Sequence, residues 1–209
     1  MKIYDISMTI HETMTVYKNK PEKKPKITNR SNFQTAQAYE STITMDMHTG
    51  THIDAPLHMI EGGETMSLYS IERFVVKAKV LDLTHIEEAI NQKDLEAFDI
   101  QENDFILFKT RNSSVEVFDF NFVYLEKSGA KFLVDRKIQG VGIDALGIER
   151  NQPNHETHKL LLGNQIMIVE GLRLKDVPEG EYTLIVLPLK ILETEAAPAR
   201  AILIQQDIM

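Results

Sequence analysis

Four side chains that commonly bind metal ions lie close together in the stretch Met45–Ile60, which reads MDMHTGTHIDAPLHMI. They are His48, His52, Asp54 and His58. Two imidazoles and a carboxylate brought to one point form a typical ligand set for zinc, manganese or iron. The spacing decides whether the local structure can bring them together.

An extended chain gathers three of these residues, whereas a helix separates them. On a helix, Asp54 would lie about 240° around the axis from His48, so the two side chains would diverge. In a strand, the even-numbered side chains His48, His52 and Asp54 share one face, and the residues between them are mostly β-branched, as strands favour. We therefore expect a strand over positions 48–54 that ends at Pro56. The alternative is a polar edge strand with scattered histidines.

The motif HTGTHIDAPLH, residues 48–58, is similar to the signature His-x-Gly-Thr-His-x-Asp-x-Pro-x-His of the metal-dependent cyclase superfamily, which includes the bacterial kynurenine formamidases. Every specified position matches. The resemblance covers most of the chain and is weakest between residues 11 and 40. In the family, this segment helps to form the substrate pocket and often has a Pro-Gly turn. Here Val16-Tyr17-Lys18-Asn19 stands at that turn without the Pro-Gly pair.

A second group of metal-binding residues is expected in the C-terminal half. The segment Glu156–Leu162 suits a short helix that ends at Gly163, and Gln165–Val169 is an apolar strand that leads to Glu170. A carboxylate beside a buried strand is costly unless a cation or hydrogen bonds compensate its charge. The alternative is that Glu170 reaches solvent at the end of the strand. In the resembled family, a His and a Glu twelve residues apart complete a two-metal centre, and His158 and Glu170 have that separation.

The resemblance implies two metal ions per subunit. It implies a first ion held by His48, His52 and Asp54, with Asp54 shared with a second ion that His158 and Glu170 also hold. Zinc is the expected metal and manganese the alternative, because both accept imidazole and carboxylate ligands.

His58 lies outside this ligand set, beyond the turn that Pro56 predicts. The resemblance implies that it transfers a proton from the attacking water to the departing amine. The alternative is that His58 supports the ligands or is itself a further ligand. The implied reaction is that of an arylformamidase, which hydrolyses N-formylkynurenine to kynurenine and formate. Two alternatives are the ring opening of a cyclic amide, as in isatin hydrolases, and metal binding without catalysis.

The composition limits the kinds of molecule that the chain is expected to bind. The chain has 209 residues, 43% of them hydrophobic and 26% charged, which suits one globular domain over residues 1–209. A net charge of −8 opposes binding to nucleic acid or to an anionic membrane, so we expect a small-molecule amide substrate. The absence of cysteine excludes thiolate ligands. The N-terminus has no apolar signal core, so a cytoplasmic location is expected.

Apolar and helical segments alternate along the chain, which predicts a mixed α/β fold with a right-handed crossover. Strands are expected at Lys2–Ser7, Phe74–Leu83, Asp104–Thr110 and Gln139–Asp144. Gln37–Met47 is expected to lead into the histidine motif as one long strand, and helices are expected at Phe120–Lys127 and Gly129–Lys137. The resemblance implies a β-barrel-like core with peripheral helices, the swivelling β/β/α fold of the family. It also implies a homo-oligomer, either a dimer or a tetramer.

Overall fold

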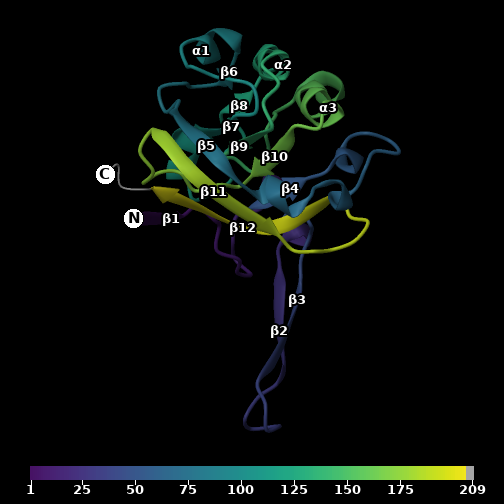
Figure 1. Cartoon of the computed structure of the whole chain (residues 1–209). Coiled ribbons are helices and arrows are strands. Elements are labelled where there is room, and N and C mark those ends of the chain that lie inside the picture. Colours follow the sequence, from purple (N-terminus) through teal and green to yellow (C-terminus); the bar gives the residue numbers. More distant parts are fainter. Residues whose placement is uncertain (206–209) are drawn as a thin grey trace.

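The computed structural model describes residues 1–205, whose strands form one eight-stranded sheet and two small two-stranded sheets (Figure 1). The strands are β1 Lys2–Asp5, β2 Lys26–Ser31, β3 Glu40–Thr44, β4 His52–Asp54, β5 Val75–Asp82, β6 Ala89–Ile90, β7 Phe105–Lys109, β8 Tyr124–Leu125, β9 Gly140–Ile143, β10 Met167–Glu170, β11 Gly180–Pro188 and β12 Ala196–Gln205. The α-helices are α1 Gln92–Glu96, α2 Lys127–Asp135 and α3 Glu156–Gly163. Short 3-10 helices lie at Tyr17–Asn19, Pro21–Lys23, Pro56–His58, Met66–Leu68, Ile71–Phe74, Arg111–Ser114 and Pro153–His155. None of the helices in this part of the chain is long and apolar enough to cross a membrane.

Seven strands of the large sheet close into a barrel in the order β12, β11, β5, β7, β9, β10, β4, and β4 pairs with β12 to complete the ring. The neighbours β5, β7, β9 and β10 run parallel, whereas the remaining pairs are antiparallel. Strand β12 closes the ring because it is long enough to pair with β4 through residues 196–198 and with β11 through residues 199–204. The expected mixed α/β fold with a barrel core is confirmed.

Side-chain alternation gives the barrel wall two apolar faces. In β7, Phe105 and Leu107 point into the barrel, whereas Ile106 and Phe108 belong to a second cluster that lies against the helices. Leu161 of α3 is part of this second cluster. Figure 1 shows α1, α2 and α3 together on one side of the sheet. A side chain on the outer face of a barrel strand near α3 is therefore buried between the barrel and that helix.

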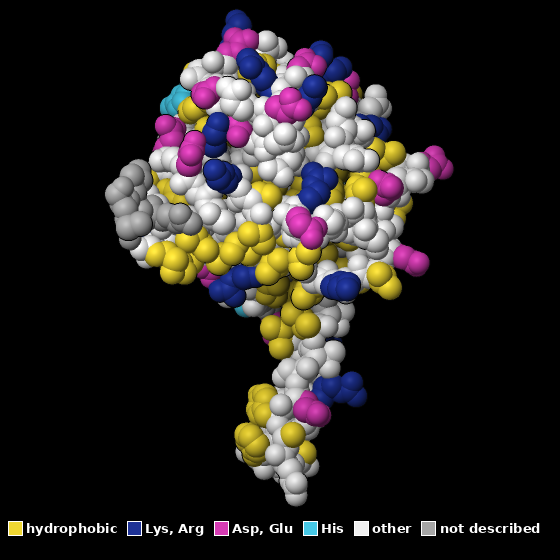
Figure 2. Space-filling model, in the orientation of Figure 1, with side chains coloured by type: hydrophobic (Ala, Val, Ile, Leu, Met, Phe, Trp, Pro, Cys, Tyr) yellow, Lys and Arg dark blue, Asp and Glu magenta, His cyan; other side chains and the backbone are white. Residues whose placement is uncertain are grey.

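Strands β2 and β3 form a hairpin, residues 26–44, that extends away from the barrel (Figure 1). We call these residues the arm. The two strands pair with each other and with no other strand of residues 1–205. Figure 2 shows hydrophobic side chains on one flank of the arm and along the neighbouring edge of the body. The exposed large hydrophobic residues of the arm are Ile27, Phe33, Tyr39 and Ile43.

The expected single strand from Gln37–Met47 into the histidine motif is wrong. Strand β3 ends at Thr44, and a turn separates it from β4. The carboxylate of Asp46 accepts the backbone N–H of His48 at 2.9 Å, and Gly50 has a φ of +67°. This conformation interrupts an extended chain and favours glycine.

The expected helix at Phe120–Lys127 is also wrong, because this segment contains β8 and helix α2 begins only at Lys127. The side chain of Asn112 accepts the backbone N–H of Val123 and donates to its carbonyl, both at 2.9 Å. These bonds satisfy the backbone in an extended conformation. The helix expected over the following residues is α2, and the four expected strands are confirmed as β1, β5, β7 and β9.

Candidate metal centre

Strands β4 and β10 place three of the expected ligands side by side. The strands are antiparallel, with His52 opposite Glu170 and Asp54 opposite Ile168. Ile53 belongs to the barrel interior, so His52 and Asp54 face the other side of the wall, toward the helices. Glu170 faces the same way as Ile168, which packs in the helix-side cluster. All three polar side chains are buried.

Helix α3 brings His158 to the same place. The helix has the expected extent and ends at Gly163. His158 is buried, and its Nε2 lies 3.4 Å from Oε1 of Glu170 and 3.8 Å from Oδ2 of Asp54. The expected strand after α3 is β10, which ends at Glu170.

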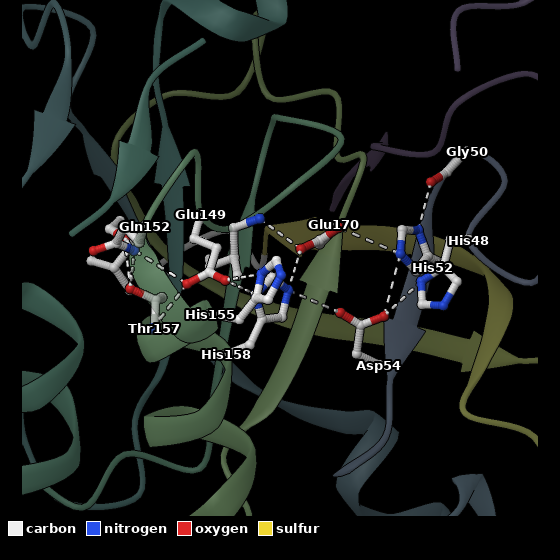
Figure 3. Close-up of polar contacts among 12 residues, drawn as sticks. His48, Gly50, His52, Asp54, Glu149, Gln152, His155, Thr157, His158 and Glu170 are labelled. Atoms are coloured by element: carbon white, nitrogen blue, oxygen red, sulfur yellow. Dashed lines mark hydrogen bonds and ion pairs between the residues drawn. The ribbon is translucent and has the colours of Figure 1, made fainter. Parts of the chain in front are cut away.

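His48 reaches the site from the turn before β4. Its Nδ1 lies 3.1 Å from Oδ1 of Asp54, and its Nε2 lies 3.7 Å from Oε1 of Glu195. The expected strand over positions 48–54 is therefore correct for His52 and Asp54 and wrong for His48. The turn nevertheless directs the imidazole of His48 toward Asp54 (Figure 3).

Asp54 lies between two groups of side chains (Figure 3). Its Oδ1 faces Nδ1 of His48 and Nε2 of His52, at 3.1 and 3.4 Å, whereas its Oδ2 faces His158. Glu170 spans the same gap, with Oε2 3.5 Å from His52 and Oε1 3.4 Å from His158. The two oxygens of Asp54 thus face different histidines, as a shared ligand would require.

Four polar atoms of this cluster are buried without a hydrogen-bond partner among residues 1–205: Nε2 of His52, Nδ1 of His158 and both carboxylate oxygens of Asp54. Leaving a buried carboxylate unpaired is costly. One ligand atom from each of His52, Asp54 and Glu170 lies within 4.8 Å of the others, and the same holds for His48, Asp54 and His58. Imidazole and carboxylate donors suit a divalent transition metal, so the residues present fit such an ion.

The buried charges shift the pKa values of the site. Burial opposes protonation of His52, but Asp54 and Glu170 outweigh it and raise the pKa of this imidazole to about 9. Burial is likewise outweighed at His158, where Glu149, Glu170 and Asp54 raise the pKa to about 10. Burial would raise the pKa of Asp54, but its histidine neighbours hold that pKa well below the ordinary value. The buried carboxylates therefore stabilise the protonated, positively charged forms of His52 and His158.

His58 lies in the short 3-10 helix that follows β4 and begins at Pro56. Its ring centroid is 4.1 Å from that of His48 and 5.5 Å from that of His158. Burial lowers the pKa of His58, and the neighbouring His48 and His158 add to the effect against the opposing carboxylates of Asp54 and Glu170. The imidazole is therefore neutral near pH 7 and is able to accept a proton.

Two glutamates beside the cluster were not predicted from the sequence. Oε1 of Glu149 lies 3.0 Å from Nδ1 of His158, and Glu195 contacts His48. Both residues lie in loops and belong to no motif, so only the tertiary structure reveals them. His155, whose spacing to Glu170 differs from the family pattern, contacts Glu149 at 2.7 Å.

An aromatic cluster borders the site. The ring centroid of Tyr17 lies 5.2 Å from that of Phe118, and the ring of Phe118 also packs against that of Phe122. Burial raises the pKa of Tyr17, and the carboxylates of Glu170 and Glu149 add to this rise. The segment that lacks the Pro-Gly turn thus places an aromatic side chain near the metal-binding residues.

A closed barrel whose outer wall presents buried histidines and carboxylates defines an α/β protein with a candidate divalent-metal centre. The model of the Cyclase family matches residues 4–150 of the sequence, which is more than half of the chain. The chain belongs to this family.

Relatives agree with this assignment over nearly the whole chain. The kynurenine formamidase of Salinibacter ruber is 31% identical over 206 residues, which are 97% of each chain. A solved structure described as a potential metal-dependent hydrolase with cyclase activity is 50% identical, with a TM-score of 0.92 over 99% of this chain and 98% of the other. Isatin hydrolase A from Labrenzia aggregata is 23% identical and shares the fold, with a TM-score of 0.86 over 98% of this chain and 94% of the other.

Proposed function

We propose that this protein is a divalent-metal-dependent amide hydrolase and that its substrate is N-formylkynurenine. The observation that carries the proposal is the buried carboxylate of Asp54, whose oxygens lack hydrogen bonds and face histidines on both sides. Such a carboxylate needs a positive charge beside it, which the protonated histidines supply in the metal-free protein and a divalent cation would supply when bound. The 31% identity to a kynurenine formamidase over 97% of the chain supports the amide substrate.

Two sets of ligands share Asp54 in this proposal. His48, His52 and Asp54 would hold one ion, and Asp54, His158 and Glu170 would hold the second. Zinc is the first candidate and manganese the second, since both accept these donors. A divalent cation supplies Lewis acidity, which polarises a carbonyl oxygen and brings the pKa of water close to about 7.

His58 moves the proton in the proposed reaction. Water adds to the formyl carbon, the carbon–nitrogen bond breaks, and formate and the aromatic amine are the products. His58 accepts a proton from the attacking water and delivers it to the departing nitrogen, which would otherwise leave as an unstable anion. Its lowered pKa supports this role because the proton acceptor must be neutral at the start of the reaction.

The aromatic cluster supports a substrate with an aromatic ring. Tyr17 and Phe118 offer ring surfaces near the metal-binding residues. Aromatic pairs in offset or edge-to-face arrangements contribute roughly 0.5–1.5 kcal/mol beyond the burial of their area. The raised pKa of Tyr17 keeps its hydroxyl protonated, so this group is also available as a hydrogen-bond donor.

Ring opening of isatin is the second candidate, because the chain shares its fold with an isatin hydrolase and both substrates are amides of aromatic amines. The test is turnover of N-formylkynurenine and, in parallel, isatin by protein stripped with a chelator and reloaded with zinc or manganese. We expect metal-dependent formate release, with no turnover by the stripped protein. Metal-dependent opening of isatin without formate release would select the second candidate. Bound metal without turnover of either amide would contradict the proposed substrate class.

A further inference from the structure

Glu149 is a buried carboxylate beside the start of α3, and four donor groups surround it. It is 5% exposed. Its Oε2 accepts the backbone N–H of Thr157 at 2.9 Å and the side-chain amide of Gln152 at 3.2 Å. Its Oε1 lies 2.7 Å from Nδ1 of His155 and 3.0 Å from Nδ1 of His158.

The two ring nitrogens of His158 face different carboxylates (Figure 3). Nε2 faces Glu170 and Asp54, whereas Nδ1 faces Glu149. Nδ1 is fully buried, and although Glu149 lies at hydrogen-bond distance, the contact is not aligned with the ring N–H. A neutral imidazole that donates from Nδ1 leaves the lone pair of Nε2 free for a metal ion.

Ile148, the residue before Glu149, binds the carboxylate of Glu170, which also faces His158. The backbone N–H of Ile148 donates to Oε1 of Glu170 at 2.6 Å, and its carbonyl accepts the N–H of Leu125 at 2.8 Å. Arg150 anchors the other end, since its guanidinium donates to the carbonyl of Phe122 at 2.9 Å. Consecutive residues of one fixed loop therefore contact both Glu170 and His158.

We propose that Glu149 is a positioning residue that holds the Nδ1–H of His158, so that Nε2 is directed toward Asp54 and Glu170. Glu149 touches neither substrate nor metal in this arrangement and acts through His158. The inference rests on the proposed metal centre, because its consequence is the affinity of that centre for the ion.

The test measures zinc affinity by competition with a chelator in Glu149→Gln and Glu149→Leu. Glutamine keeps an acceptor oxygen and loses the charge, whereas leucine loses both. We expect affinity about 10-fold weaker for the first and about 100-fold weaker for the second. Glu156→Gln is the matched control, because Glu156 starts the same helix but pairs with Lys127 at the surface, and its affinity is expected to stay unchanged. Unfolding of the metal-free variants identifies any that fail to fold.

Two further measurements separate positioning from a general structural effect. In the zinc-loaded protein, 15N spectra of His158 should show coordination through Nε2 with a protonated Nδ1, and Glu149→Leu should show a mixture of the two coordination modes. In the background of His158→Ala, Glu149→Gln should weaken zinc binding no further.

Equal zinc affinity in the Glu149 variants and the control would overturn the inference and leave the proposed function intact. A full additional loss on top of His158→Ala would also overturn it, because Glu149 would then affect zinc binding independently of His158. Failure of the unaltered protein to bind zinc or manganese would instead overturn the proposed function.

Discussion

At the scale of single residues, the proposed metal centre depends on Asp54. The residue is fully buried, and each of its oxygens faces a different set of histidines. A hydrogen-bonded structural aspartate would have donors aimed at it, as Asp144 has from Thr110 and Ser113. Asp54 has no such donor among the described residues. This contrast within one chain supports the proposed role of Asp54 as a metal ligand.

Zinc affinity should rise with pH. In the metal-free protein the pKa values of His52 and His158 are about 9 and about 10, so both imidazoles are protonated at pH 7 and the metal must displace their protons. Raising the pH toward these values weakens the competition, by up to about a hundredfold in affinity per pH unit if two protons leave. Calorimetric titrations in buffers of different ionisation enthalpy would count the protons. Binding without proton release would contradict the protonated state.

Replacement of His58 should separate chemistry from metal binding. His58→Ala removes the proposed proton carrier and leaves the five proposed ligands in place, so we expect unchanged metal content and turnover about 10²- to 10⁴-fold slower. His85→Ala, at an exposed histidine, serves as the control. Loss of metal together with activity would make His58 a ligand, and undiminished turnover would remove it from the mechanism.

At the scale of elements, the site depends on the close approach of two turns. Gly50 precedes β4 and Gly171 follows β10, and both have positive φ angles, of +67° and +70°. A Cβ added to Gly171 would lie only 2.4 Å from the carbonyl oxygen of Gly50. Thr51 fastens the turns by donating its hydroxyl to the carbonyl of Gly171 at 2.7 Å. The ends of β4 and β10, and with them His52 and Glu170, are held together by this contact.

Gly171→Ala should therefore destabilise the protein more than an ordinary glycine substitution. Gly62 is the matched control, since it has the same φ of +70° and an added Cβ would contact nothing within 4 Å. We expect a loss of about 1 kcal/mol for Gly62→Ala from backbone strain alone, and of about 2 kcal/mol or more for Gly171→Ala, where a backbone clash is added. Urea unfolding of the metal-free proteins measures both. Equal losses would show that the two turns do not need this close approach.

The sequence predicted these elements where a local pattern determines them. The alternation of His52, Ile53 and Asp54 was sufficient to predict a strand with both ligands on one face, and Gly163 marked the end of α3. The pattern did not predict the turn that carries His48, because alternation by residue type continues through it. Glu149 was missed for a different reason. Its role comes from contacts with a helix several residues later in the chain, and no local spacing encodes them.

At the scale of the whole molecule, barrel closure unites distant parts of the sequence. Strand β4 lies between β10 and β12, so the histidine motif, the C-terminal strand and the His158–Glu170 segment meet at one place. Neither composition nor periodicity predicts which strands are neighbours, and the barrel was expected from the family resemblance. The resemblance did not predict the arm, most of which falls within the least similar segment, residues 11–40.

The arm is the surface at which we expect copies of the chain to meet, if the homo-oligomer implied by the resemblance forms. A two-stranded hairpin is marginal in water without further packing. Phe33 and Tyr39 near its tip are 78% and 62% exposed, and their ring centroids are 6.3 Å apart. Reciprocal contacts between two copies would bury these rings on both sides.

Replacing residues 27–43 by Asn-Gly should abolish the oligomer, because Lys26 and Thr44 are paired neighbours that a two-residue turn can connect. Light scattering is expected to give the mass of one chain for this variant and a multiple of it for the unaltered protein. Phe33→Ser with Tyr39→Ser should weaken association, whereas Gln34→Ser with Gln37→Ser should not. If the variant without the arm still had a mass that is the same multiple of one chain, the copies would associate through another surface.

The most direct test of the account is the amount of metal bound by Asp54→Ala and His158→Ala, measured by mass spectrometry of the ions after reloading and desalting. If Asp54 is shared between two ions, its removal should abolish both, whereas His158→Ala should retain the ion held by His48, His52 and Asp54. Equal retention of metal in the two variants would contradict the shared role of Asp54 and the two-ion centre built around it.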